Sequence, residues 1–206
     1  MQQILTKDGS ITFHNEKYGE SYHSVSGAIE ESFKKFAEPC CVKDRMRILD
    51  ICFGIGYNSL AAVHMSKDLE IVGLENDKKI LEKIKDVKVS DELKEDYEII
   101  KKAAESGYDD GKLKIKIIAG DARNTIKEVD GEFDAVFLDP FSPKKCPELW
   151  TLEFFIEIKK KIKKGGILAT YSCARIARDN LKKAGFEVKD GPVVGRKAPG
   201  TLALNL

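Results

Sequence analysis

Four acidic residues accompany apolar segments of the kind that form buried strands. Asp50 lies in ILDICFGIGYNS, Glu75 ends IVGLE, Asp121 follows LKIKIIAG, and Asp139 ends DAVFLD. Carboxylates accept hydrogen bonds from hydroxyl and amino groups, and they stabilise positive charge that develops on a nearby atom. If the four segments are parallel strands of one sheet, their carboxyl ends share an edge, and the acids form one polar rim where a ligand can bind.

The turn after the first segment contains Gly54 and Gly56, and a helical pattern begins at Asn58. Glycine lacks the Cβ that would block a sharp turn and the close approach of a ligand to the backbone. Glu75 follows Gly56 by nineteen residues, at the end of the next apolar segment, where its oxygens can accept both hydroxyls of a ribose. This order of strand, glycine turn, helix, strand and acid predicts a site for an adenosine-containing cofactor, with Asn58 among the candidate binding residues.

The residues around this turn favour one cofactor over another. A dinucleotide site would have a third glycine at position 59, where this chain has Ser59. An acid inside the first strand, Asp50, would also repel a pyrophosphate, but it suits a ligand with positive charge. S-adenosylmethionine, with its ammonium and sulfonium groups, is therefore the favoured cofactor; a dinucleotide and a plain tight turn are the alternatives.

Two further motifs complete the candidate site. In Gly-Asp-Ala, the Asp121 carboxylate can accept from an adenine amino group while the Ala122 N–H donates to the ring; the alternative is a helix N-cap. In Asp-Pro-Phe-Ser-Pro, proline forces the chain out of the sheet and leaves Asp139 at the rim. Asp139 can accept an amine N–H and stabilise charge on an attacking nitrogen, and Phe141 offers a face for a base, although a rigid turn with a capping Asp is also possible.

The elements that must position these residues alternate along the chain. Apolar runs predict strands, and period-3.6 patterns predict helices. We expect strands at 47–52, 70–75, 113–119, 134–139 and 167–172, and helices at 27–37, up to 65, twice within 77–106, at 151–164 and up to 184. The final FEVKD and TLAL have no helix between them and must pair as an antiparallel hairpin. The predicted fold is a doubly wound α/β sheet, mostly parallel.

Composition narrows the class of protein. No window of about 18 apolar residues exists, and residues 1–25 lack a signal-peptide core, so we expect a cytoplasmic protein that does not enter a membrane. The five cysteines show no C-x-x-C spacing and the three histidines no metal-ligand spacing, which argues against a disulfide framework and against a metal site. We expect residues 1–206 to form one domain with residues 1–25 as an arm, where Asp8-Gly9 predicts a short hairpin.

The charge distribution is asymmetric. Residues 140–206 hold 14 Lys and Arg against 6 Asp and Glu, a balance of +8, whereas residues 1–139 hold 21 against 28, a balance of −7. Such asymmetry indicates a polyanionic partner, and the candidate contacts nearest the predicted site are Lys144, Lys145, Arg196 and Lys197. For the run KKKIKK at 159–164, the alternative is a solvated helix end.

Several stretches together resemble a known family. DGSITF, YGESYHSVSGAIEES, ILDICFGIGYNS, FLDPFSPKKCPELWT and GRKAPGTLAL are similar to the methyltransferase part of the bifunctional enzyme that completes 5-methylaminomethyluridine in tRNA. The resemblance covers nearly the whole chain. It implies a Rossmann-like class I methyltransferase that uses S-adenosylmethionine to methylate a tRNA wobble uridine carrying an aminomethyl group.

The resemblance also implies roles for residues. Gly54 and Gly56 would flank the methionine part of the cofactor, Glu75 would bind the ribose, and Asp121 the adenine edge. Asp139 would lie beside the methyl group and the incoming amine. The segment from Ser24 to Gly27 would line the methionine end.

This chain departs from the family pattern in one respect. Two other functions also remain as alternatives. No second glycine-rich fingerprint follows, so we expect no fused flavin oxidase domain and a stand-alone methyltransferase. One alternative is a polyamine-synthase type enzyme that transfers an aminopropyl group; the basic charge of residues 140–206 argues against its polycationic substrate. The other is a non-catalytic tRNA-binding module, against which the retained acids argue.

Overall fold

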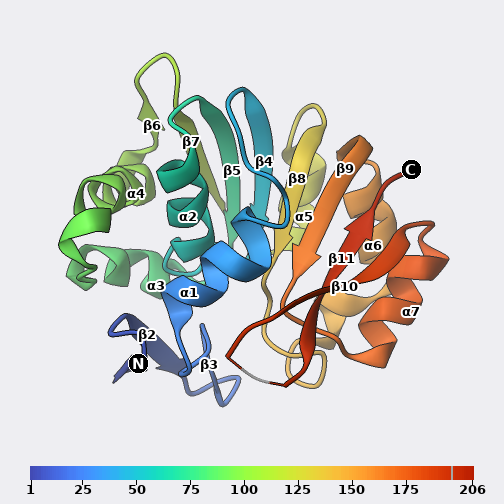
Figure 1. Ribbon diagram of the computed structural model, residues 1–206, viewed down its shortest axis with the longest axis horizontal. Helices are drawn as coiled ribbons and strands as arrows, with labels where there is room; N and C mark the ends of the chain where they lie inside the picture. The colour runs from blue at the N-terminus through green and yellow to red at the C-terminus, as the bar shows by residue number, and fades with distance from the viewer. Residues whose placement is uncertain (196) are drawn as a thin grey trace.

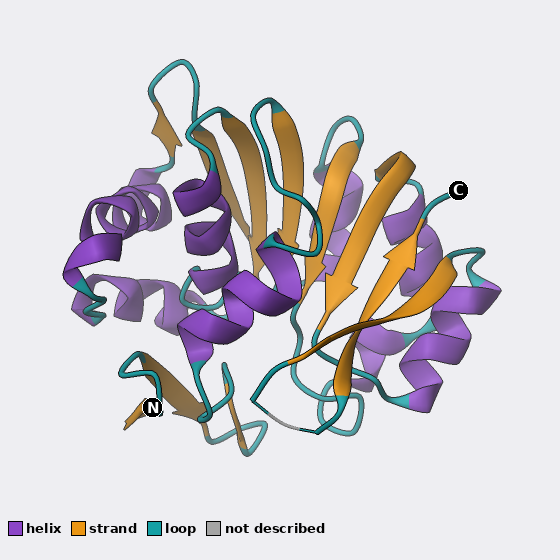
Figure 2. Cartoon of the chain, in the orientation of Figure 1, coloured by secondary structure: helices purple, strands orange, loops and turns teal. Residues whose placement is uncertain are grey.

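A central eight-stranded sheet organises the molecule. The computed structural model describes residues 1–195 and 197–206, and its sheet has the strand order β10-β11-β9-β8-β4-β5-β7-β6. The parallel strands are β4 (Met46–Ile51), β5 (Leu69–Glu75), β7 (Lys114–Ala119), β8 (Phe133–Leu138) and β9 (Ile162–Thr170). All five predicted strands are therefore present, and the doubly wound α/β fold is confirmed (Figures 1 and 2).

Helices cover both faces of this sheet. On one face lie α1 (Ala28–Glu31), the π-helix η1 (Ser32–Ala37), α2 (Tyr57–Met65) and α4 (Lys94–Ser106); on the other lie α5 (Ala122–Glu128), α6 (Leu152–Lys159) and α7 (Arg175–Lys183) (Figure 1). Two hydrophobic cores result because strand residues alternate between the faces: Ile48 belongs to the first core, and Leu49 and Ile51 to the second. Within the described residues, no helix is both long and apolar enough to span a bilayer.

The segment between β5 and β7 contains two helices separated by a break, as expected for residues 77–106. It forms α3 (Lys78–Lys83) and the 3₁₀ turns η2 (Ile84–Asp86) and η3 (Asp91–Leu93) before α4, and the two-residue strand β6 (Tyr108–Asp109) follows. The C-terminal strands β10 (Glu187–Val193) and β11 (Pro199–Leu204) pair antiparallel, as predicted, and β11 pairs antiparallel with β9.

One predicted helix is too long. The predicted helix 151–164 ends at Lys159, and β9 already begins at Ile162, which pairs with Phe133 of β8. Gly165-Gly166 therefore lies inside a strand and does not end a helix. The β8–β9 register shifts here, Gly165 has a φ of 81°, and a Cβ on Gly166 would lie 2.7 Å from Ile162, so glycine permits this irregularity.

The first 25 residues form more than a hairpin. β1 (Gln2–Leu5) and β2 (Ile11–Asn15) make the predicted hairpin, and β3 (Glu20–Ser21) adds a third strand. This N-terminal sheet lies beside the carboxyl ends of the central strands (Figure 1). The following helix begins with Gly27, not Ser26, at its N-cap. The assignment of residues 1–206 to a single domain stays a prediction.

Candidate active site

A cavity of about 460 Å³ opens where the parallel strands end. Its volume lies within the ~300–1,000 Å³ typical of small-molecule sites. Loops after β4, β5, β7 and β8 form its walls together with the N-terminal sheet. The predicted residues that line it are Gly54, Glu75, Asp121, Ala122, Asp139 and Phe141.

The glycine turn and Glu75 form one unit in this wall. Gly54 and Gly56 have φ values of 58° and 79°, and a Cβ on Gly56 would lie 2.6 Å from Ile100. The Gly54 N–H donates to Glu75 Oε2 at 2.8 Å, and the Asp77 N–H donates to Oε1 at 2.7 Å. Each carboxylate oxygen keeps a second lone pair, so the backbone aims Glu75 without using up its capacity to accept. Burial raises the pKa of Glu75 to about 7.

Asp121 fits both interpretations of its motif. Its side chain accepts from the Arg123 N–H at the start of α5, so it is the predicted N-cap, and it also lines the cavity. The hydrogen bonds from the Arg123 guanidinium hold the pKa of Asp121 below its usual value. Its carboxylate is therefore ionised and can accept a donor from a ligand.

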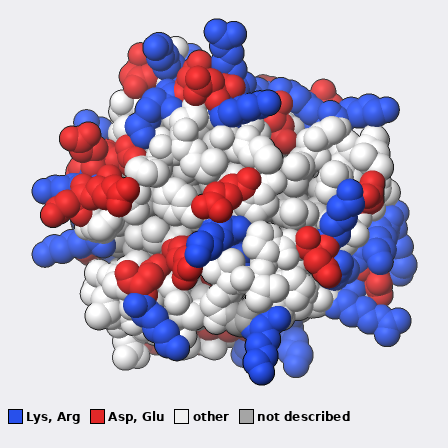
Figure 3. All heavy atoms as spheres, in the orientation of Figure 1, with Lys and Arg blue, Asp and Glu red and all other residues white. Residues whose placement is uncertain are grey.

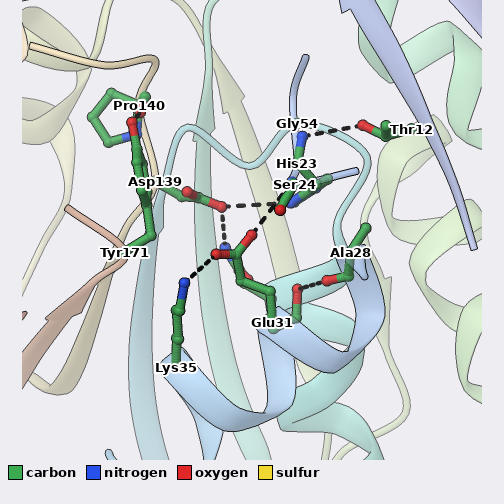
Figure 4. Close-up of polar contacts among 12 residues, drawn as sticks. Thr12, His23, Ser24, Ala28, Glu31, Lys35, Gly54, Asp139, Pro140 and Tyr171 are labelled. Atoms are coloured by element: carbon green, nitrogen blue, oxygen red, sulfur yellow. Dashed lines mark hydrogen bonds and ion pairs between the residues drawn. The ribbon is translucent and has the colours of Figure 1, made fainter. Parts of the chain in front are cut away.

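Asp139 is held in the wall by polar side chains from separate elements. Its side chain is 9% exposed; Asn58 Nδ2 donates to Oδ2 at 2.9 Å, and His23 Nδ1 lies 3.7 Å from the same oxygen. Figure 4 shows His23 approaching the Asp139 carboxylate. Burial, and then the nearby charge of Glu31, raise the pKa of Asp139. A carboxylate in this setting is a stronger proton acceptor than an exposed one.

A buried ion pair lies behind Asp139. Lys35 Nζ lies 2.6 Å from Glu31 Oε1, and the Lys35 side chain is only 1% exposed. The Ser24 N–H donates to the other Glu31 oxygen at 3.3 Å, which ties the segment before α1 to this pair (Figure 4). Sequence reasoning missed both residues; the available signal was their four-residue spacing with Ala28 on the same helix face.

Three buried polar atoms have no hydrogen-bond partner among the described residues: His23 Nε2, Asn58 Oδ1 and Asp50 Oδ1. Buried polar groups are normally paired, so such atoms indicate a place for a polar ligand or water. His23 lines the cavity, and burial lowers its pKa to about 4, which keeps the imidazole neutral at pH 7. His23 was not singled out from the sequence, although it lies in YGESYHSVSGAIEES.

Four acids were expected to line one rim, but only three of them line the cavity, and the prediction is wrong for Asp50. Asp50 lies inside β4, fully buried, and accepts from Ser59 Oγ at 2.6 Å without lining the cavity. Burial raises its pKa to about 7. An acid one residue before a strand's end points toward the covering helix because side chains alternate, so α2 buries it.

Other predicted residues also lie behind or beside the cavity. Gly56 and Asn58 begin α2 and do not line it, and Ser24 adjoins the lining residue His23 without lining it itself. Gly27 caps α1, with a φ of 145°. The influence of these four residues on a ligand is therefore indirect in this structure. Among the cysteines, Cys52 and Cys173 are half-buried, and Cys52 lines the cavity.

The basic residues do not form one patch at the cavity. Lys144 and Lys145 are exposed in the loop after β8, and Lys197 is exposed; Arg196 lies outside the described residues. The run 159–164 lies where β9 begins, at the opposite end of the strands from the cavity. Its lysines form local ion pairs, as in Lys160–Glu157 and Lys163–Asp134. Figure 3 shows basic side chains spread along the margins with acidic ones between them. For that run, the solvated-edge alternative is the better interpretation.

No group of three or more His, Cys, Asp or Glu residues that could hold a metal ion occurs in the part of the chain that the structure describes. The polar groups around the cavity are instead suited to hydrogen bonding: carboxylates that accept and backbone amides that donate. Glu75 beside the glycine turn suits the ribose of S-adenosylmethionine, Asp121 suits its adenine, and the carboxylate of Asp139 suits its positive charge; all three line the cavity.

Comparison with known proteins supports this fit. Residues 85–205 match the family model described as S-adenosyl-L-methionine-dependent methyltransferase. An uncharacterized protein of Methanocaldococcus jannaschii is 36% identical over 97% of this chain and 58% of its own length. The tRNA 5-methylaminomethyl-2-thiouridine biosynthesis bifunctional protein MnmC of Leptospira interrogans is 31% identical over 94% of this chain. The chain spans only 34% of that bifunctional protein.

Solved structures give the same assignment. The crystal structure of MNMC2 from Aquifex aeolicus matches with a TM-score of 0.88 and 36% identity, over 98% of this chain and 70% of that one. A spermidine synthase in complex with the transition state analogue AdoDATO matches with a TM-score of 0.65 and 15% identity, over 94% and 69%, which shows a shared fold alone. The chain belongs to the family of S-adenosyl-L-methionine-dependent methyltransferases, with a Rossmann-like class I fold and similarity throughout to the methyltransferase part of MnmC proteins.

Proposed function

We propose that this chain is an N-methyltransferase that converts aminomethyluridine to methylaminomethyluridine at the wobble position of tRNA, in the cytoplasm. The observation that carries the proposal is the likeness to MNMC2 over 98% of the chain, combined with a buried Asp139 at the wall of the cavity. The relatives named MnmC indicate the tRNA nucleoside, and the cavity supplies a carboxylate suited to an amine.

Within this proposal, the cofactor residues divide by position. Glu75 binds the ribose hydroxyls, while Asp121 and the Ala122 N–H bind the adenine edge; all three line the cavity. Gly54 lets the backbone approach the methionine part. The remaining five residues act as positioning residues behind this surface, since none of them lines the cavity: Gly56, Asn58, Ser24, Gly27 and Asp50.

Asp139 has the central role in the reaction. S-adenosylmethionine supplies a methyl group made electrophilic by the sulfonium. A free alkylamine has a pKa of about 10.4, so at neutral pH the substrate arrives mostly as an ammonium that must lose a proton before its nitrogen can attack. The Asp139 carboxylate accepts an N–H of this group, orients the nitrogen and stabilises the charge that arrives on it. Asn58 fixes the carboxylate's orientation through the 2.9 Å hydrogen bond.

The tRNA itself is held outside the reacting groups. Phe141 lines the cavity directly after Asp139-Pro140, where a base can stack on it. Lys144 and Lys145 follow in the same loop, and Lys197 lies in the loop before β11. We propose these three cations as phosphate contacts, together with Arg196, which lies outside the described residues.

One observation favours a second candidate, aminopropyl transfer to a polyamine. The cavity lining carries several acids, including Glu16, Asp77 and Glu148. Its described basic side chains are Lys17 and Lys79, so a polycationic substrate would meet negative charge. The basic charge of residues 140–206 argued against such a substrate, but part of it, the run 159–164, lies where β9 begins, away from the cavity at the carboxyl ends of the strands. The spermidine synthase likeness shows only the fold and does not decide the matter.

The deciding experiment compares both reactions on the same preparation. tRNA carrying aminomethyluridine is incubated with the protein and S-adenosylmethionine, and its nucleosides are analysed by mass spectrometry for methylaminomethyluridine. In parallel, putrescine is supplied with decarboxylated S-adenosylmethionine, and spermidine is measured. Formation of the methylated nucleoside alone supports the proposal. Spermidine alone would replace it with aminopropyl transfer, and cofactor binding that is undetectable by calorimetry would indicate a non-catalytic RNA-binding module.

A further inference from the structure

Two segments that are distant in sequence meet at the wall of the cavity. One is the β2–β3 turn, residues 15–20, and the other is the loop that leaves β8, residues 140–146. Tyr18 of the turn and Phe141 of the loop stack with ring centroids 4.5 Å apart and an interplanar angle of 25°. Tyr22 packs on the same Phe141 ring at 5.1 Å. All three residues line the cavity, so this part of its wall is aromatic.

Hydrogen bonds hold the two segments together. The Glu20 carboxylate accepts from the Ser142 N–H at 2.9 Å and from Ser142 Oγ at 2.5 Å. Asn15 Oδ1 accepts from the N–H groups of Lys17 and Tyr18 at 3.0 and 3.3 Å, which fixes the turn. The aromatic pair is therefore held in place before any ligand arrives, so little conformational entropy would be lost on stacking.

Cations surround the aromatic pair. Lys17 Nζ lies 5.0 Å from the centroid of the Tyr18 ring. Lys145 Nζ approaches the same turn, because a Cβ on Gly19 would lie 3.5 Å from it, and the exposed Lys144 precedes it. Glu16 is the exposed acid of this turn, whereas Glu20 is satisfied by Ser142. Aromatic faces with flexible cations at their margin are the pattern by which proteins hold single-stranded nucleic acid.

We propose that the β2–β3 turn and the β8 exit loop form a composite binding site for one unstacked nucleotide of an RNA loop. The base stacks against the Tyr18–Phe141 pair, and Lys17, Lys144 and Lys145 contact the flanking phosphates. The N-terminal sheet thereby becomes part of the RNA site. This inference rests on the proposed function for the identity of the polymer, and it adds Tyr18 and Lys17 to the recognition of the substrate.

The test measures RNA binding and needs no turnover. The probes are a fluorescently labelled RNA hairpin with a single-stranded loop and a blunt duplex of equal length. Tyr18→Leu removes the ring. Two variants serve as controls: Tyr18→Phe keeps the ring, and Tyr108→Leu removes an aromatic residue from β6, the outermost strand of the sheet. One stacked base contributes ~1–3 kcal/mol, so we expect Tyr18→Leu to weaken hairpin binding about tenfold, with both other variants near wild type. Wild-type affinity in Tyr18→Leu, or equal binding of hairpin and duplex by the wild type, would overturn the site.

A second measurement covers the cations and any folding defect. The double variant Lys17→Ala/Lys145→Ala removes two exposed charges, so the slope of log affinity against log salt should fall by about 1.4 for single-stranded RNA. An unchanged slope contradicts the phosphate contacts. A thermal unfolding midpoint and a circular dichroism spectrum like those of the wild type show that each variant is folded.

The two proposals can fail separately. If the wild type does not methylate aminomethyluridine tRNA but the hairpin-binding pattern holds, the nucleotide site stands and the proposed reaction falls. If methylation proceeds normally in Tyr18→Leu at low RNA concentration, the reaction stands and the nucleotide site falls.

Discussion

The two ends of the same parallel strands treat acidic residues differently. Where the strands begin, acids meet cations: Arg47 makes two hydrogen bonds to Glu70, and Lys163 pairs with Asp134. Where the strands end, Glu75 and Asp139 are held by backbone amides and by Asn58, and buried acceptor atoms stay unpaired.

We call the amino ends of the parallel strands the structural edge and their carboxyl ends the binding edge. Solvated ion pairs contribute little to stability but leave no group unsatisfied. Buried carboxylates without a cation destabilise the empty protein and have raised pKa values, which is the arrangement found where a ligand supplies the missing partner. Glu75 and Asp139 therefore lower the stability of the ligand-free protein at the carboxyl ends of the strands, whereas Asp121 at the same ends pairs with Arg123.

The first prediction concerns Asp139→Asn, which keeps the side chain's shape and removes its charge. We expect turnover of the proposed methylation to fall about a hundredfold or more, because one electrostatic stabiliser of the transition state is lost. Cofactor affinity should change little. Single-turnover kinetics on aminomethyluridine tRNA gives the rate, and calorimetry gives the affinity; a rate close to that of the wild type would remove Asp139 from the mechanism.

The second prediction concerns Glu75→Ala. The change removes the acceptor that the Gly54 and Asp77 amides hold in the cavity wall. Charge-assisted hydrogen bonds contribute about 1.5–3 kcal/mol each, so S-adenosylmethionine should bind at least tenfold more weakly. Glu70→Ala, at the other end of the same strand, is the matched control and should bind normally. Equal cofactor affinities for the two variants would contradict the assignment of the edges.

The third prediction concerns Asp50→Asn and pH. The pKa of Asp50 is raised to about 7 in the folded state, so its contribution to stability is present below about 3.8 and is lost as pH rises through about 7. Asparagine cannot ionise, so the ligand-free variant should be more stable than the wild type at pH 8 by on the order of 1–3 kcal/mol.

The difference between Asp50→Asn and the wild type should narrow as pH falls toward 4. Urea unfolding of both chains across this range measures it. A difference that does not depend on pH would mean that Asp50 does not titrate on folding.

The fourth prediction concerns the structural edge. Glu70→Gln weakens a half-exposed pair with Arg47. We expect the free energy of unfolding to change by less than about 1 kcal/mol, because exposed ion pairs contribute little and are screened by salt. Chemical denaturation at low and high salt measures this. A loss of several kcal/mol would show that the two edges do not differ in the way we describe.

Local sequence signals were sufficient for much of the fold and part of the site. The glycine turn, the acid nineteen residues later and the proline after Asp139 each depend on backbone geometry within a few residues, so Glu75 and Asp139 were found at strand ends facing the cavity. The helix ending at Lys159 was misplaced because a strand beginning with Ile162 is decided by its pairing with β8, which no local pattern reveals.

The sequence by itself determined the alternation of strands and helices, the cofactor turn and the family resemblance, because these depend on residue periodicity and on short spacings. Only the tertiary structure decided which acids face the cavity, since α2 buries Asp50 while the loop after β8 exposes Asp139 to the cavity. It also brought His23, Glu31 and Lys35 behind Asp139, and Tyr18 onto Phe141. These contacts join residues more than a hundred positions apart, and they form only when the N-terminal sheet and the first helix pack against the strand ends.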